Sequence, residues 1–396
     1  MARQKIITRD FILNFFAQFS FSSASFVLIP TIPIFLSRLG AKGIEIGFLV
    51  GILNFCSLVP RLFIGRALLR IPERKFMMAG AVLYILSSAA YLIASPFWPF
   101  LMVRIFQGAG LAFFATASFT LIANSAPETH RGRIISYYSL SFNFAFAIAP
   151  YFGMLLINQF NFTILFLVCI GLSLCALFTT IKLTKAQSVY SAESESIRNQ
   201  PLLSRETFPA ATMAFMLNFI WGALGAFFPL YALAHGVTNP GIFFAIFATT
   251  LILGRALGGR ILDTHERRQI IVPCLITTVV SMFMLIFSTT LFLFMVIAVI
   301  LGAGWALLYP SLLIYAIERS GFARGPAMGT FTALADLGTG LGPMMMGFIL
   351  QWTSYPIMFL CLTLVGFMNI VFYYGVLNKG KGVEKKSSHS LSQYLP

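Results

Sequence analysis

Two stretches of this chain repeat one pattern of arginine and glycine. Residues 61–74 read RLFIGRALLRIPER, and residues 255–268 read RALGGRILDTHERR. Each stretch opens on an arginine, places Gly-Arg at its fifth and sixth positions and ends among basic residues. Agreement of this kind at a fixed offset indicates an internal repeat.

The repeat continues outward on both sides of these stretches. Further glycines, prolines and charged residues match in order, and the offset drifts only from 196 to 193 residues. The matched positions are Arg9-Asp10 with Arg205-Glu206, Pro33 with Pro229, Gly40 with Gly236, Gly47 with Gly241, Gly108-Ala-Gly110 with Gly302-Ala-Gly304, Arg131-Gly132 with Arg324-Gly325, and Ala149-Pro150 with Gly342-Pro343. The chain is therefore predicted to hold two copies of one unit.

The composition places both copies in a lipid bilayer. The 396 residues are 58% hydrophobic and 10% charged, whereas roughly 25% of an ordinary soluble domain is charged. At about 20 apolar residues per crossing, the sequence predicts an all-α membrane protein with twelve transmembrane helices in two six-helix pseudo-repeats around a central cavity. The predicted spans lie near 11–36, 44–66, 76–95, 98–122, 133–157, 161–182, 208–232, 240–262, 269–288, 291–317, 326–350 and 354–377.

Four segments follow from this layout. The N-terminal six-helix half covers residues 1–183, and a polar stretch rich in Ser, Glu and Gln forms a cytoplasmic linker over 184–207. The C-terminal six-helix half covers 208–378, and a basic cytoplasmic tail covers 379–396.

The distribution of positive charge predicts the orientation. The net charge of +15 could suggest a nucleic-acid partner, but the basic residues fall in short clusters between apolar runs rather than in one patch. Of the 27 Lys and Arg residues, 22 lie in the two tails and the even-numbered connectors, and Arg38 and Lys42 lie on the other side. By the positive-inside rule we expect a multi-pass protein of a prokaryotic cell (inner) membrane with both termini cytoplasmic, and no nucleic-acid partner.

Three motifs carry a resemblance to a known family. Residues 259–268, GRILDTHERR, are similar to the loop signature Gly-x-Leu-Ala-Asp-Arg-x-Gly-Arg-Arg, and Arg104-Ile-Phe-Gln-Gly108 resembles the Arg-x-x-Gln-Gly pattern of proton-coupled exporters. Residues 338–343, GTGLGP, resemble the glycine-rich run of the exporter signature. Over its whole length the chain resembles the major facilitator superfamily, which implies alternating access by two rocking halves.

The resemblance also implies a gate on the cytoplasmic side. The first copy has Leu69 where the loop signature has an acid, so Asp263 is the better candidate for the gate latch. Arg61 and Arg255 lie within spans, and their long side chains can reach the inner interface, which favours a purely structural role. Their presence in both copies of the repeat instead favours a role in the gate. The gate candidates are Arg61, Gly65, Arg66, Arg255, Gly259, Arg260 and Asp263.

Two ionisable residues inside spans are the candidates for proton coupling and substrate binding. Asp336 is the only acid predicted near the bilayer midplane, and its protonation could depend on Arg104 or on a bound substrate. Arg104 lies in the fourth span, where it either reaches the outer interface or faces the cavity. For Asp336 the alternative is a hydrogen bond to a neighbouring helix.

Polar and aromatic residues within spans are candidates for lining the cavity. In the family the first, fourth, seventh and tenth spans line it, and Asn143 is the repeat partner of Asp336. For each residue the alternative is an interhelical hydrogen bond or an interfacial aromatic. The cavity-lining candidates are Asn14, Gln18, Gln107, Asn143, Asn218, Trp221, Trp305 and Tyr309.

The favoured function is proton-coupled efflux of a small organic molecule by alternating access. The alternative is uptake or export of an organic anion, such as a carboxylate metabolite or a siderophore-like metal chelator. The sequence holds no HExxH, metal-ligand cluster or ATP-binding motif, so we expect no enzymatic activity, metal or cofactor, and energy from an ion gradient. The expected partners are a small-molecule substrate, protons and the lipid bilayer, and the expected state is a monomer.

Overall fold

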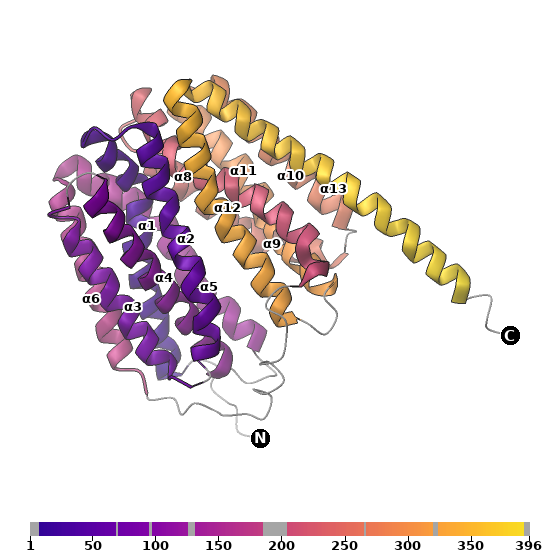
Figure 1. Cartoon of the computed structure of the whole chain (residues 1–396), viewed down its shortest axis with the longest axis horizontal. Helices are drawn as coiled ribbons and strands as arrows, with labels where there is room; N and C mark the ends of the chain where they lie inside the picture. The colour runs from indigo at the N-terminus through magenta and orange to yellow at the C-terminus, as the bar shows by residue number, and fades with distance from the viewer. Residues whose placement is uncertain are drawn as a thin grey trace.

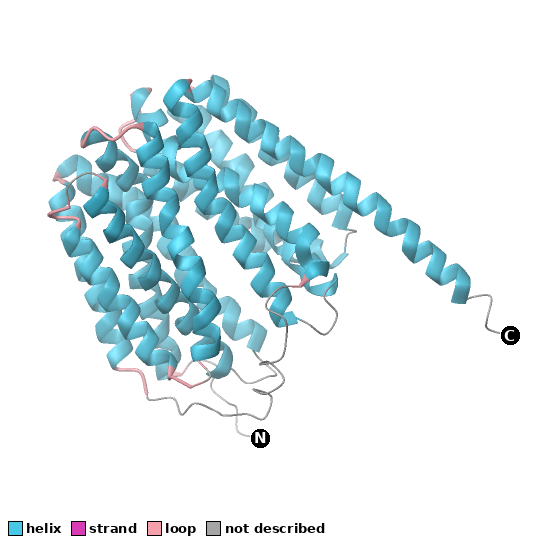
Figure 2. Cartoon of the chain, viewed as in Figure 1, coloured by secondary structure: helices cyan, strands magenta, loops and turns pink. Residues whose placement is uncertain are grey.

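The structure is a computed structural model of the whole chain. It describes residues 8–68, 70–94, 97–125, 131–184, 204–264, 267–319 and 324–391, in which every regular element is a helix (Figure 2). The helices fall into two groups, one from each half of the chain (Figure 1). The first group is α1 (Arg9–Arg38), α2 (Gly43–Ala67), α3 (Glu73–Ala90), α4 (Trp98–Ser125), α5 (Arg131–Gln159) and α6 (Phe162–Ile181). The second is α8 (Phe208–Ala234), α9 (Gly241–Thr264), α10 (Arg267–Phe287), α11 (Leu291–Arg319), α12 (Arg324–Trp352) and α13 (Tyr355–Leu391).

The predicted fold class of twelve helices in two six-helix halves is confirmed. Eleven of these helices are long and apolar enough to cross a membrane in the part of the chain that was searched. The twelfth, α3, has 18 residues and opens on the three charged residues of 73–75, which lowers its hydropathy.

Two segments outside the spans can be compared with the structure. The apolar part of the last helix, Tyr355–Gly375, agrees with the predicted span near 354–377, and α13 continues to Leu391 through most of the predicted tail, 379–396. In the predicted linker, 184–207, residues 185–203 lie outside the described part, and Arg205–Thr207 form the short 3-10 helix η2 that leads into α8.

The turns after α1 and α8 confirm the repeat at the level of the backbone. Gly40 and Gly236 have φ angles of +83° and +78°, the left-handed conformation that glycine adopts without steric cost. In both turns the next residue donates its N–H back into the helix, from Ala41 to Leu36 O and from Val237 to Ala232 O, at 3.0 Å in each. This is the Schellman arrangement that ends a helix, built twice from repeat-related residues.

Glycine contacts between neighbouring helices also occur in both halves. A Cβ on Gly108 of α4 would lie 2.5 Å from Leu53 O, and a Cβ on Gly302 of α11 would lie 2.8 Å from Phe247 O. Leu53 and Phe247 are themselves 194 positions apart. The contact of α4 with α2 is thus repeated by the contact of α11 with α9, because only glycine lets the backbones approach so closely.

The two halves meet through α2 against α12 and through α5 against α9. A Cβ on Gly47 would collide with Pro343 O, and a Cβ on its repeat partner Gly241 would collide with Pro150 O. Gly47 and Gly241 lie near the end of the bundle at which α1 ends and α2 begins, which we name the charge-poor end; the opposite end, where α1 begins, is the charge-rich end. The helices of the two halves come together at the charge-poor end and spread toward the charge-rich end (Figure 1).

We predict that Gly47→Ala separates the halves at the charge-poor end. The added methyl group meets the backbone at Pro343 rather than a flexible side chain, so α2 and α12 must move apart. Spin labels at Ser37 and Thr353 in a cysteine-free background would report a longer or broader distance distribution in the variant.

The matched control for this prediction is Gly171→Ala. Gly171 lies in α6, and a Cβ there would have no neighbour within 4 Å. An unchanged distance in Gly47→Ala, equal to that in Gly171→Ala, would show that the glycine contact does not hold the halves together.

Candidate functional site

An ion pair joins the two halves inside the bundle. Arg61 of α2 donates to the carboxylate of Asp336 on α12, and the exposed fractions of the two side chains are 31% and 22%. Asp336 lies 12 residues after the first residue of α12, about 18 Å along the helix at 1.5 Å per residue. The predicted midplane acid therefore has a cationic partner, and that partner comes from the other half of the chain.

Tyr309 and Arg255 complete a cluster around this ion pair. The ring of Tyr309 packs on Phe331 of α12, centroids 5.4 Å apart and five residues before Asp336. A Cβ on Gly258, three residues after Arg255, would meet Leu307, two residues before Tyr309, at 2.6 Å. Tyr309 comes from α11 and Arg255 from α9, so four helices contribute. We name Arg61, Arg255, Tyr309 and Asp336 the charged cluster.

Arg255 lies on the face of α9 that turns toward α11. It shares this face with Gly254 and Gly258, whose added Cβ atoms would meet Ala306 and Leu307 of α11 at 2.7 and 2.6 Å. Leu253 and Leu257 on another face are exposed, as expected for residues in contact with lipid. The Arg255 side chain is itself exposed.

Arg104 is not at this cluster, and the expectation that it influences Asp336 is not supported. Arg104 is 5% exposed, and it donates from Nε to Leu49 O at 3.0 Å and from Nη1 to Gln107 Oε1 at 3.0 Å. Tyr91 also donates to Gln107 Oε1. These partners all lie within the first half, so the described contacts of Arg104 and Gln107 hold α2, α4 and the end of α3 together.

A buried polar network crosses the first half near the charge-rich end. Asn14 donates to Ser118 O at 3.1 Å and accepts from Ser118 Oγ at 2.9 Å. Tyr138 bonds to Ser118 Oγ and donates to Gln18 Oε1 at 3.1 Å. Asn14 and Gln18 therefore form interhelical hydrogen bonds among α1, α4 and α5 in this conformation, which is the alternative that the sequence left open for them.

Aromatic side chains from both halves meet between the charged cluster and the charge-poor end. The ring of Trp221 lies 4.8 Å from Phe247, 5.5 Å from Trp305 and 5.6 Å from Phe146, centroid to centroid. Phe146 belongs to the first half and the other three to the second. Trp305 and Tyr309 are four residues apart on α11, so the aromatic rings lie one turn from the charged cluster.

The remaining predicted residues are placed as follows. Asn143 of α5 is partly exposed, and Asn218 of α8 donates to Ala214 O of its own helix at 2.8 Å. The side chains of five gate candidates lie outside the described residues, although their backbones belong to α2 and α9. These are Gly65, Arg66, Gly259, Arg260 and Asp263.

Sequence reasoning missed Tyr138, Ser118 and Tyr91. Each is a hydrogen-bonding residue in or beside an apolar run, and each is at most 2% exposed. Their sequence spacing to Asn14, Gln18 and Gln107 carries no signal, because the partners are on different helices. One signal was available in the sequence. Asn14, Gln18 and Ser118, which surround Tyr138, are polar where the second copy of the repeat is apolar, at Ala210, Ala214 and Leu312.

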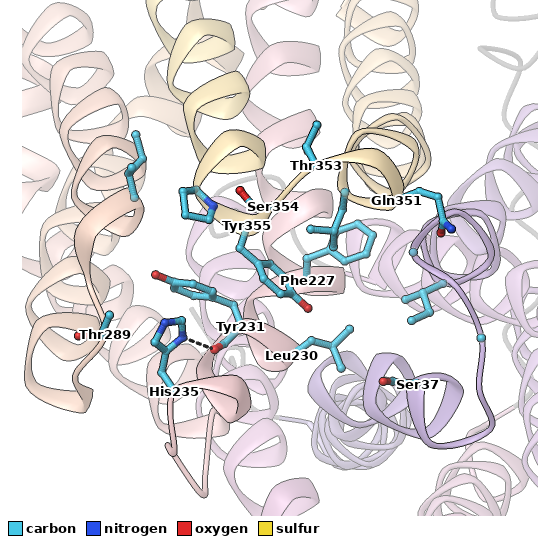
Figure 3. A pocket seen from close by; sticks show the side chains of 16 residues that line it. Ser37, Phe227, Leu230, Tyr231, His235, Thr289, Gln351, Thr353, Ser354 and Tyr355 are labelled. Atoms are coloured by element: carbon cyan, nitrogen blue, oxygen red, sulfur yellow. Dashed lines mark hydrogen bonds between the residues drawn. The ribbon is translucent and has the colours of Figure 1, made fainter.

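A cavity of about 680 Å³ opens at the charge-poor end, between α1, α2, α8, α10, α12 and α13 (Figure 3). Phe227, Tyr231 and Tyr355 form its aromatic wall, with the rings of Tyr231 and Tyr355 5.3 Å apart. The Nδ1 atom of His235 lies 2.9 Å from Tyr231 O. Gln351, which also lines the cavity, is 15 residues after Asp336 on α12, about 22 Å along the helix, so this cavity is separate from the charged cluster.

Comparisons with known proteins agree with this architecture. The family model described as Major Facilitator Superfamily matches residues 15–243 and 237–394. The chain is 26% identical over 359 residues to the staphylopine export protein of Staphylococcus aureus, covering 86% of this chain and 89% of that protein. It is 24% identical over 371 residues to multidrug resistance protein 2 of Bacillus subtilis, covering 87% and 88%.

Two solved structures share the fold at low sequence identity. The nucleoside transporter NupG superposes with a TM-score of 0.75 at 13% identity, over 92% of this chain and 99% of that one. A bacterial homologue of the human lysosomal transporter Spinster, in an inward-facing and unoccupied conformation, has a TM-score of 0.73 at 14% identity, over 92% and 95%. With both halves matched by the family model and arranged as two six-helix groups, the chain belongs to the Major Facilitator Superfamily of membrane transporters.

Proposed function

We propose that this transporter exports a small organic molecule in exchange for protons, by alternating access, across a prokaryotic cell membrane. The observation that carries the proposal is the ion pair of Arg61 with Asp336, because it joins an acid inside a membrane-spanning helix to the opposite half. A charged side chain at this depth is costly and marks an ion or proton pathway by default.

The proton site works through the contact between the halves. When Asp336 is ionised, its charge is neutralised by Arg61, and α12 is held to α2. When Asp336 is protonated, it is neutral and its hold on Arg61 weakens, since the Coulomb attraction between the two opposite charges is lost. Protonation thereby changes the free energy of a contact between the two moving bodies, which is what coupling requires.

The conformation fits one step of such a cycle. The close glycine contacts between the halves lie at the charge-poor end, which the positive-inside rule assigns to the outside of the cell. With the outer ends together, the transporter is open toward the cytoplasm. An exporter that has just released its proton into the cytoplasm would hold an ionised acid, paired as Asp336 is here.

Export rather than uptake is supported by the relatives. The staphylopine export protein and multidrug resistance protein 2 both carry out export or resistance by their names, and both align with most of this chain. NupG is named as a nucleoside transporter and matches in fold alone. We therefore assign outward transport from the staphylopine export protein and multidrug resistance protein 2.

The first prediction is that Asp336→Asn abolishes proton coupling. Asn cannot ionise, so it imitates the protonated acid permanently and carries no proton through the cycle. The protein is reconstituted in liposomes with a pH-sensitive dye inside, and organic anions and amphipathic cations are screened for substrate-dependent proton flux under a pH gradient. We expect flux in the wild type and at least a tenfold loss in Asp336→Asn, with downhill exchange of substrate retained.

The matched control is Glu206→Gln, which removes an acid from the exposed helix η2 outside the membrane spans. It should transport as the wild type does. Proton flux that is equal in Asp336→Asn and in the wild type would remove Asp336 from the mechanism. Substrate uptake driven by an inward-directed proton gradient would show that substrate and protons move together, and it would reverse the assigned direction.

A further prediction concerns the ion pair as a contact. Arg61→Asp should separate α2 from α12, because two acids then face each other, and the double variant Arg61→Asp with Asp336→Arg should restore the approach. Spin labels at the exposed positions Phe63 and Met328 measure this distance in a cysteine-free background. Equal distances in all three proteins would mean that the ion pair has no part in holding the halves.

A further inference from the structure

The two interfaces between the halves are related by the repeat. In the first, α2 packs on α12, and in the second, α9 packs on α5. Gly47 against Pro343 and Gly241 against Pro150 are the same contact made twice, since Gly47 matches Gly241 and Pro150 matches Pro343. Each side chain at one interface therefore has an equivalent position at the other.

Arg61 and Arg255 occupy equivalent places at these two interfaces. Val59 and Phe63 beside Arg61 are exposed, as are their repeat partners Leu253 and Leu257 beside Arg255. On the opposite face, Ser57 and Ile64 of α2 are buried. The corresponding positions of α9, Leu251 and Gly258, are buried as well. Both arginines thus leave their helices on the inward side at the same depth.

The acid, by contrast, is present at only one interface. The repeat partner of Asp336 on α12 is Asn143 on α5, at an offset of 193 residues. Arg61 is neutralised by Asp336, whereas the residue at the equivalent position for Arg255 is a neutral amide. In the described part of the chain the Arg255 guanidinium has no carboxylate partner.

The charged cluster accordingly holds one positive charge in excess, from two arginines and one ionised acid. Arg255 leaves α9 beside the part of α11 that carries Tyr309, and Tyr309 packs on Phe331 of α12, five residues before Asp336, so the excess is local. A cation without a counter-ion is costly within the membrane. An anionic group of a ligand would supply the missing charge at Arg255, and the Asn143 amide could donate a second hydrogen bond to it.

We infer that Arg255 and Asn143 bind a carboxylate of the transported substrate, in the position that corresponds to that of Asp336 at the other interface. Trp221, partly exposed at the edge of the aromatic rings one turn from Tyr309, provides an apolar contact for the rest of the same molecule. The substrate class is thus a small organic acid with an apolar body. This inference rests on one part of the proposed function, namely that the protein transports a small molecule. It does not depend on proton coupling.

The test is binding at equilibrium, without any gradient. Isothermal titration of the full-length protein in lipid nanodiscs uses benzoate and 2-naphthoate, each compared with its amide, which has the same shape and no charge. We expect at least one acid to bind the wild type about tenfold or more tightly than its amide, as one charge-assisted contact provides. Absence of a preference for either acid in the wild type would overturn the inference.

Four variants locate the preference. Arg255→Gln should abolish the advantage of the acid over the amide, and Arg255→Lys should retain part of it. Asn143→Asp should also abolish it, because the new carboxylate neutralises Arg255 from within, whereas the uncharged Asn143→Ala should retain most of it. Thermal unfolding of each variant checks that it is folded.

The outcomes separate this inference from proton coupling. Asp336→Asn should keep the preference for the acid, since Arg255 is unchanged. Loss of proton flux with an intact preference would confirm both proposals, and an intact preference with unchanged flux in Asp336→Asn would leave only the anion site. A preference that survives both Arg255→Gln and Asn143→Asp would overturn the anion site whatever the flux.

Discussion

The absence of water from the core of the bilayer constrains every part of this protein. A polar group that leaves water must find a partner within the protein, or its burial costs free energy. Backbone groups meet this condition by forming helices. Arg104 meets it through a backbone carbonyl and a glutamine, Asn14 and Gln18 through a network with Ser118 and Tyr138, and Asp336 through Arg61. Arg255 differs from these side chains because it is exposed and has no carboxylate partner in the described part of the chain, which is why it attracts a functional interpretation.

The two halves have one backbone plan and different polar contents. The network of Asn14, Gln18, Ser118 and Tyr138 in the first half has Ala210, Ala214, Leu312 and Phe331 as its repeat partners, and all four of these are buried. At these four positions the first half is therefore joined by directional hydrogen bonds, and the second by apolar packing. The acid that pairs across the halves lies in the second half, next to the aromatic rings. The two halves thus share the same close helix contacts and differ in the side chains placed between them.

The sequence predicted the parts of the fold that depend on period and composition. Apolar length located twelve helices, and the matching glycines located turns and contacts that the structure forms twice, as at Gly40 and Gly236. The partner of Asp336 was not predicted, because a repeat identifies equivalent positions without saying which positions touch. The contacts of Arg104 were not predicted for a similar reason: one of its two acceptors is the carbonyl of Leu49, and a backbone acceptor has no signature in a sequence. Asp336 could be singled out from the sequence because a rare charge in an apolar run is visible without knowledge of its neighbours.

The glycine contacts between the halves also bear on the speed of the conformational change. Where Gly47 meets Pro343 and Gly241 meets Pro150, backbone touches backbone, with no long side chain between them. Such a surface has few rotamers to reorganise, whereas interlocked side chains must leave one set of holes and enter another. One half can then roll over the other with little side-chain rearrangement. Under the proposed mechanism, the charged groups then set the height of the barrier between the two conformations, so turnover would respond to protons and substrate.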